Sequence, residues 1–116
     1  MKPDPDDYLP LAPATLHILL SLAGEPMHGY GIMQEVLDRT GGKVRLWPAT
    51  LYGSLKRLIE AGLIEESGDR PSRELDDARR RYYRLTRLGR RVLDAESARL
   101  QELVRILQVK RGLEAL

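Results

Sequence analysis

The sequence predicts a mainly α-helical domain that carries a small β hairpin and ends in one long helix. Three observations favour this fold class. Apolar residues recur at helical spacing in three segments between residues 13 and 62. Two short segments with strand-like alternation follow at 63–66 and 80–85, and a polar loop with Gly and Pro separates them. A further helical pattern begins at Thr86 and continues to about Arg111.

Composition excludes several classes of site. The chain has 116 residues and no Cys, which excludes disulfides, thiolate metal ligands and Cys nucleophiles. Its two His lie far from any cluster of ligand residues, so we expect no metal site and no cofactor. Neither a phosphate loop nor paired carboxylates in an apolar setting occur, so we expect no enzyme. No apolar run has the length of a membrane span, and no signal peptide opens the chain, so we expect a soluble cytoplasmic protein with no membrane partner.

The first two predicted segments are an arm and a helix. Residues 1–12 contain three Pro and three Asp and predict a flexible N-terminal arm. A helix follows from Pro13, and Gly24-Glu25-Pro26 ends it. Its predicted apolar stripe is Leu16, Leu19, Leu20 and Ala23. Ile18 and Leu22 lie off that stripe, so the helix is apolar nearly all round and needs cover on more than one side.

Two further helices complete the predicted helical part of the domain. One runs from about His28 to Thr40 and stops at Gly41-Gly42, with His28 as an unusual N-cap. Its apolar stripe is Tyr30, Met33, Val36 and Leu37. The other begins at Pro48, where a missing N–H costs nothing. Its inward face is Leu51, Leu55, Leu58, Ile59 and Gly62.

The long C-terminal helix carries an apolar seam that one small domain cannot cover. Leu93, Leu100 and Leu107 repeat at a spacing of seven, and Leu103 and Val104 lie between them. Such a seam predicts a partner helix, most simply from a second copy of the chain. The alternative is that the seam packs back on the first helix, which also has surplus apolar surface. Both arrangements are compatible with one homodimer.

Three helices followed by a hairpin is the order of a winged helix-turn-helix, in which the third helix enters the major groove of DNA and the hairpin is the wing. We therefore divide the chain into an arm at 1–12, a winged domain at 13–86 and a dimerisation helix at 87–116. The outward face of the third helix, with Tyr52 and Ser54 on its two flanks, predicts the DNA contacts. These candidates are Ala49, Thr50, Tyr52, Gly53, Ser54, Lys56 and Arg57.

Each candidate has a structural alternative. Lys56 and Arg57 could pair with guanine edges or phosphates, or simply face solvent beside Glu60. Gly53 costs about 1 kcal/mol relative to Ala inside a helix, which indicates either close approach to DNA or simple tolerance. Trp47 is interpreted first as a packing residue, with ligand stacking as the alternative.

The basic residues are concentrated rather than spread. Net charge is only +2, but residues 79–91 contain seven Arg and no acid. This segment predicts a polyanion-binding surface, with a solvated helix face or pairing to acids of the last helix as the alternative. The predicted wing loop also holds acids, so its charge is mixed. The further DNA-contact candidates are His28, Tyr30, Arg70, Arg73, Arg80 and Arg81.

Three stretches together resemble the PadR family of bacterial transcriptional regulators. They are HGYGIM at 28–33, TGGKVRLWPATLYGSLKRLIEAGLI at 40–64 and RRYYRLTRLG at 80–89. The resemblance extends from about residue 14 to residue 107, and the single terminal helix is similar to that of the smaller subfamily. It implies a homodimer that binds double-stranded operator DNA, usually as a repressor, and that in some members is released by a small-molecule effector.

The chain departs from the family pattern at three points. Gly53 stands where Pro is frequent, and Gly31 stands where an acidic residue is common. The helix from residue 86 onward has no Phe, Trp or Tyr, which argues against an aromatic ligand pore there. A winged-helix protein-interaction module is the alternative function, and an RNA-binding winged helix is another. The Arg-rich segment and the apolar seam favour a dimeric DNA-binding regulator.

Overall fold

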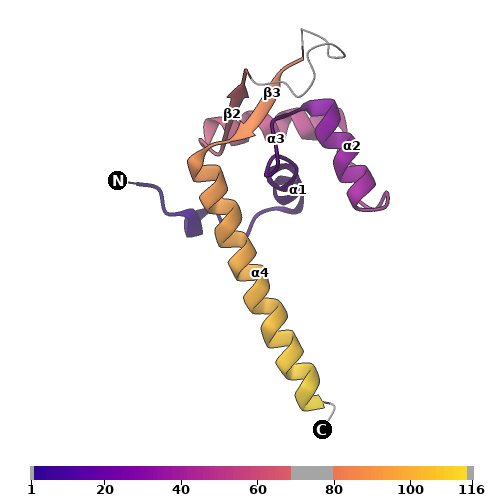
Figure 1. Cartoon of the computed structure of the whole chain (residues 1–116), viewed down its shortest axis with the longest axis vertical. Coiled ribbons are helices and arrows are strands. Elements are labelled where there is room, and N and C mark those ends of the chain that lie inside the picture. Colours follow the sequence, from indigo (N-terminus) through magenta and orange to yellow (C-terminus); the bar gives the residue numbers. More distant parts are fainter. Residues whose placement is uncertain (1, 69–79, 115–116) are drawn as a thin grey trace.

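The computed structural model describes residues 2–68 and 80–114. In chain order its elements are η1 (Pro5–Tyr8), α1 (Pro13–Ser21), β1 (Met27–His28), α2 (Gly29–Arg39), α3 (Pro48–Glu60), β2 (Ile64–Ser67), β3 (Tyr82–Leu85) and α4 (Arg87–Glu114) (Figure 1). The winged helix-turn-helix arrangement with a long C-terminal helix is thus confirmed. In the described part of the chain, no helix combines the length and the apolar character that a membrane span needs.

The core forms where α1, α2 and α3 meet the sheet and the start of α4. Ile18 and Leu19 of α1 are buried, and so is Leu22 just after it. Of the predicted stripe, Leu19 is thus covered, whereas Leu20 is 43 % exposed. A helix that is apolar nearly all round gives no single periodic face, and the surrounding elements decide which side is covered. By contrast, α3 has one apolar face, and its Leu51, Leu55 and Leu58 are buried as predicted. Ile59 and Gly62, which the sequence also places on the inward face, are exposed.

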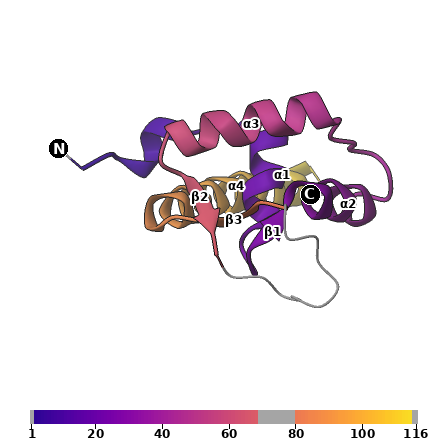
Figure 2. The same cartoon turned by 90° about the horizontal axis from the view of Figure 1, so that it is seen from above.

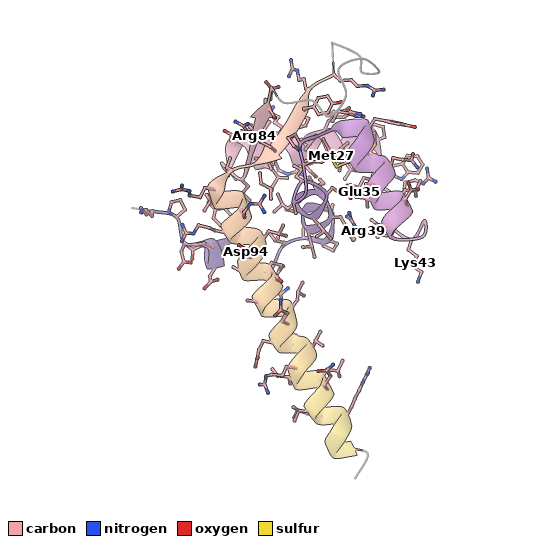
Figure 3. All side chains as sticks on the ribbon, viewed as in Figure 1. Met27, Glu35, Arg39, Lys43, Arg84 and Asp94 are labelled. Carbon is pink, nitrogen blue, oxygen red and sulfur yellow. The ribbon has the colours of Figure 1, made fainter. Side chains whose placement is uncertain are left out.

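An arginine joins α2 to α1. Arg39 extends from α2 toward α1 (Figure 3), where its Nη2 donates to the His17 carbonyl oxygen at 3.1 Å. The same guanidinium lies 3.5 Å from Glu35, one turn earlier on α2. His17 therefore lies in a structural contact between two helices.

The sheet has three strands in the order β1-β3-β2, all antiparallel. The sequence predicts only β2 and β3, because two residues are too few to show alternation. β1 pairs Met27 with Tyr83 and His28 with Tyr82. This pairing fixes the start of α2 directly against the wing.

Two predicted caps are present in the structure. His28 Nδ1 accepts the Gly31 N–H at 3.0 Å and so caps α2. Thr86 Oγ1 accepts the Gly89 N–H at 3.0 Å at the start of α4. Gly89 also allows α4 to begin directly against the domain, because a Cβ at this position would overlap the Leu63 carbonyl oxygen.

The N-terminal segment is not the flexible arm that the sequence predicts. Residues of η1 and the turn after it pack on α4 and the core, with Tyr8, Leu9 and Leu11 partly buried. The Leu11 N–H donates to Glu96 Oε2 at 2.7 Å, and the Glu96 side chain is fully buried. A buried carboxylate needs donors, so it holds this backbone in place. Arg99 is the second donor, and its hydrogen bond lowers the pKa of Glu96 despite burial; the Leu11 N–H lowers it further.

The two halves of α4 have different surroundings. Its first half packs on the domain through Val92, and its second half extends away from it (Figure 1). Of the predicted seam, Leu93 packs partly against the domain's own core. The exposed apolar side chains farther along are Leu100, Leu103, Val104, Ile106, Leu107 and Val109.

Candidate nucleic-acid interface

The open side of α3 carries the residues that the sequence places there. α3 lies along one edge of the domain, so one side packs on the core and the other faces outward (Figure 2). The exposed candidates are Ala49, Thr50, Tyr52, Lys56 and Arg57, with Gly53 half-buried among them. These placements agree with the predicted face. Whether the side chains contact DNA remains a prediction.

Ser54 is a correction to that face. The sequence places it on a flank, but the structure leaves it only 4 % exposed. It lies one turn before Leu58 and three residues after Leu51, inside the arc that α3 buries. Its Oγ accepts a hydrogen bond from Arg57 Nη2 at 3.3 Å. We therefore expect Ser54 to orient Arg57 rather than to reach a ligand itself.

Gly53 has no packing reason to be glycine. A Cβ added there would have Arg57 Nη1, at 3.6 Å, as its nearest neighbour, which is ordinary van der Waals contact. The fold could thus accept Ala, and the helix would gain from it. Because Gly53 has no side chain, a ligand can come closer to the backbone of α3 at the centre of its open face, beside the Arg57 guanidinium.

Three separate segments converge beside α3 on one pocket of about 340 Å³. It is lined by His28, Gly29, Tyr30, Tyr52, Arg80, Arg81 and Tyr83. They come from β1 and the start of α2, from α3, and from β3 with the two residues that precede it. Gly29 permits this convergence, because a Cβ there would lie 2.7 Å from the Tyr52 hydroxyl oxygen. Five of the seven lining residues are predicted DNA contacts; the other two are Gly29 and Tyr83.

His28 is the central residue of this pocket. Its Nδ1 accepts the Gly31 N–H, which assigns the proton of the neutral ring to Nε2. Arg80 Nη1 lies 3.1 Å from that Nε2. The His28 ring also packs edge-on against Tyr82, with centroids 5.2 Å apart. The Arg80 guanidinium brings a positive charge to this pocket, and such a group suits an anionic oxygen, such as that of a phosphate.

The charge of the wing strands is partly compensated within the sheet. Arg81 lies 3.5 Å from Glu66, and Arg84 Nε donates to Glu65 Oε1 at 3.2 Å. The sequence left open whether Arg84 pairs with acids of the last helix; this ion pair instead joins β3 to β2. Both pairs are exposed, so the arginines can exchange partners at small cost. Arg70 and Arg73, also predicted as contacts, lie outside the described residues.

Tyr83 is a pocket residue that sequence reasoning missed as a site residue. Burial raises the pKa of its phenol, and the nearby Glu66 carboxylate raises it further. Tyr83 therefore lines the pocket as a neutral group at neutral pH. The pairing of Tyr83 with Met27 places it beside β1, and the sequence gives no signal for β1.

A second concave surface lies between α1 and the distal part of α4. This groove has a volume of about 600 Å³. Its apolar lining is Leu16, Leu20, Leu93, Leu100 and Val104. The surplus apolar side of α1 and the seam of α4 thus form one continuous surface. The sequence offers two alternatives for the α4 seam, a partner helix or packing toward α1, and both involve this groove.

The fold agrees with what known proteins show. The model of the Transcriptional regulator PadR-like family matches residues 18–95. The chain belongs to this family. A transcriptional regulator of Mycobacterium tuberculosis is 39 % identical to it over 94 residues, which cover 81 % of each chain. The resemblance on which the predicted family rests is thereby confirmed.

Solved structures of PadR proteins share the fold. A PadR family transcription regulator from Clostridium difficile is 28 % identical, with a TM-score of 0.60 over 85 % of this chain and 95 % of its own. Bacillus subtilis PadR, solved in complex with operator DNA, is 23 % identical, with a TM-score of 0.59 over 74 % of this chain and 47 % of its own. The family match includes the pocket and the open face of α3, and it ends before the distal half of α4. This PadR-like chain is a transcriptional regulator by family.

Proposed function

We propose that the chain is a homodimeric, sequence-specific DNA-binding repressor. The observation that carries this proposal is the convergence of His28, Tyr30, Tyr52 and Arg80 on one pocket beside the open face of α3. These residues come from separate segments of the chain, and together they bring an imidazole, a guanidinium and two phenols to one surface. A similar fold in Bacillus subtilis PadR is solved with operator DNA, which supports the same partner here.

In this proposal the contacts divide by role. α3 enters the major groove, where Lys56 and Arg57 meet base edges and the low surface at Gly53 allows close approach. The pocket donors from His28 and Arg80, with the Tyr30 and Tyr52 hydroxyls, hold a backbone phosphate and fix the register. The wing follows the backbone beside the groove through Arg81. Phosphate contacts supply affinity, and α3 supplies sequence preference.

The distal half of α4 provides the dimer contact. Its exposed aliphatic side chains and the Leu20 side of α1 would be covered by the same surfaces of a second copy. A two-fold dimer places the two α3 helices one turn of DNA apart, about 34 Å, and predicts an operator with two-fold symmetry.

A small-molecule effector fits the same groove. Its volume of about 600 Å³ and mainly apolar lining are typical of sites for small apolar molecules. A ligand there would touch both α1 and α4 and so favour one angle between them. It would release DNA only if it bound one dimer arrangement more tightly than the other.

Fluorescence anisotropy tests the function directly. The probes are the duplex upstream of the chain's own gene and a scrambled duplex, each at two salt concentrations. We expect a preference for the native duplex that survives the higher salt. Equal and steeply salt-sensitive binding to both would contradict sequence specificity for that site. Absence of binding to either at low salt would favour the protein-interaction module.

A further inference from the structure

The loop that leads into α3 exposes a large aromatic side chain. Trp47, the only Trp in the chain, is the residue before Pro48, and its side chain is 63 % exposed. From the sequence we interpret Trp47 as a packing residue, and its exposure in the structure contradicts this interpretation. An exposed indole on a small domain is costly in water and marks a contact surface when charged groups accompany it.

The exposure of Trp47 follows from how this loop is anchored. Residues 44–47 alternate between inside and outside, because Val44 and Leu46 turn toward the core and Arg45 and Trp47 turn away from it. Trp47 has an extended backbone, with φ −78° and ψ 152°. Burial of Leu46 therefore fixes both outward side chains on one side of the loop.

Arg45 and Trp47 form a pair on that outer side. The Arg45 guanidinium carbon lies 5.1 Å from the centre of the Trp47 ring, in a cation–π arrangement. The ring holds a long, flexible cation in a defined place at little further entropic cost. A planar guanidinium stacked on an indole presents its outer N–H groups to an anionic oxygen.

The charge around the pair indicates which partner it meets. Residues 40–59 contain four basic residues, Lys43, Arg45, Lys56 and Arg57, and no acid. The pair is also continuous with the open face of α3, because Pro48, Ala49 and Thr50 are all exposed. A positive surface with an aromatic face, adjoining a helix proposed to enter the groove, fits the backbone of duplex DNA.

We propose that Arg45 and Trp47 form an additional DNA-contacting element that extends the footprint of α3. Arg45 binds a backbone phosphate, and the Trp47 ring packs against the adjoining deoxyribose. This inference rests on the proposed function. It adds a contact at the N-terminal end of α3, separate from the His28 pocket that involves the start of α2 and the wing.

The single Trp makes the test direct, because all indole emission reports on this position. The full-length chain is titrated with the labelled duplex upstream of its own gene, and anisotropy and Trp emission are recorded together. We expect Trp emission to change with the same midpoint as anisotropy. We also expect acrylamide quenching of Trp47 to fall when the duplex is bound.

The outcomes separate this inference from the function itself. A rise in anisotropy with unchanged Trp emission and quenching overturns the DNA-contacting element and leaves the proposed function standing. Failure of anisotropy to rise with any duplex overturns both. Emission that changes with protein concentration alone, and not with duplex, assigns the pair to a contact between copies and also overturns it.

Variants give an independent readout. Arg45→Gln should weaken binding roughly three- to tenfold and reduce the log–log salt slope by about one, as loss of one phosphate contact does. Trp47→Ala should weaken binding roughly tenfold with little change in salt slope, and Trp47→Phe should restore part of the loss. Lys2→Gln, an equal change of charge at an exposed position of the N-terminal segment, is the control.

Because both side chains are exposed, each variant should melt at the wild-type temperature, which circular dichroism checks. Folded Arg45→Gln and Trp47→Ala proteins that bind the duplex as the wild type does would overturn the inference.

Discussion

The exposed faces of α3 and of distal α4 differ in chemistry, although both helices are amphipathic. The face of α3 carries small, hydroxylated and basic side chains around Gly53, whereas distal α4 exposes aliphatic side chains such as Leu103 and Leu107. Donors and cations suit a hydrated polyanion, and aliphatic groups suit a dry partner. Exposure alone therefore does not identify an interface, but its chemistry indicates the class of partner.

The largest expected effect is on the aliphatic face. Leu100→Asp should raise the dissociation constant of the dimer roughly a hundredfold or more, because an unpaired carboxylate in an apolar contact costs about 3 kcal/mol or more. Light scattering and sedimentation measure the change. Ala98→Asp, an equal charge at another exposed position of α4, is the control and should remain dimeric. A Leu100→Asp protein that stays dimeric would place the contact elsewhere.

On the polar face, Arg57→Ala should weaken operator binding by about 1–3 kcal/mol and leave folding intact. In this variant the Ser54 hydroxyl loses the hydrogen bond that it accepts from Arg57, and a water molecule can replace that donor. Anisotropy against the native and scrambled duplexes measures the loss. Lys2→Ala removes the same charge from an exposed position of the N-terminal segment and should bind as the wild type does. Wild-type affinity of Arg57→Ala would mean that this residue faces solvent only.

Two ion pairs on α4, each between residues three apart in the sequence, allow a buried carboxylate to be compared with an exposed one. Glu96–Arg99 is buried at the carboxylate, whereas Glu102–Arg105 is exposed at both partners. Glu96→Gln should lower the melting temperature at neutral pH by roughly 5 °C, because Leu11 N–H and Arg99 lose a charged acceptor. Glu102→Gln should change it little.

The pH dependence of that difference has a definite sign. The pKa of Glu96 is lowered on folding from its usual value near 4.5. Its stabilising effect is therefore complete above that value and is lost as pH falls through the lower pKa of the folded state. Thermal melts of wild type and Glu96→Gln between pH 3 and 7 should converge at the acid end. A difference that stays constant across this range would contradict a role for the Glu96 charge.

The smallest effect is expected at Gly53. Gly53→Ala should stabilise the domain by up to about 1 kcal/mol, because the fold has room for a Cβ and Ala favours helix. It should also weaken operator binding if DNA approaches that position closely. Chemical denaturation and anisotropy measure the two effects separately. Gain of stability with unchanged affinity would assign Gly53 to simple tolerance.

The sequence predicts α3 and its open face well, because Leu51, Leu55 and Leu58 define a single inward arc. It fails for α1, where apolar residues surround the helix and only the neighbours select Ile18 over Leu20. It also misses β1, because a two-residue strand has no period. Periodic patterns report which side of an element is apolar, and they do not report which apolar sides tertiary contacts cover.

Other parts of the site depend on contacts between distant residues. Glu96 looks like an ordinary helix surface acid until Leu11 and Arg99 enclose it, so the ordered N-terminal segment could not be predicted. The pocket around His28 forms because Gly29 has no side chain and Tyr52 can lie against it. The spacing of residues in the sequence does not predict this contact. The sequence also predicts the wrong exposure for Ser54 and Trp47, because the exposure of these side chains depends on how the surrounding residues pack.

The distal part of α4 has a mechanical consequence. α4 is a single helix of 28 residues, about 42 Å long, and it contacts the domain from Gly89 as far as Glu96. The part beyond Glu96 is therefore a lever arm about 27 Å long. A tilt of about 5° at Glu96 moves the far end of this arm by about 2 Å, given the helical rise of about 1.5 Å per residue. In the proposed homodimer, such a tilt would change the distance between the two α3 helices, which the spacing of successive major grooves has to match.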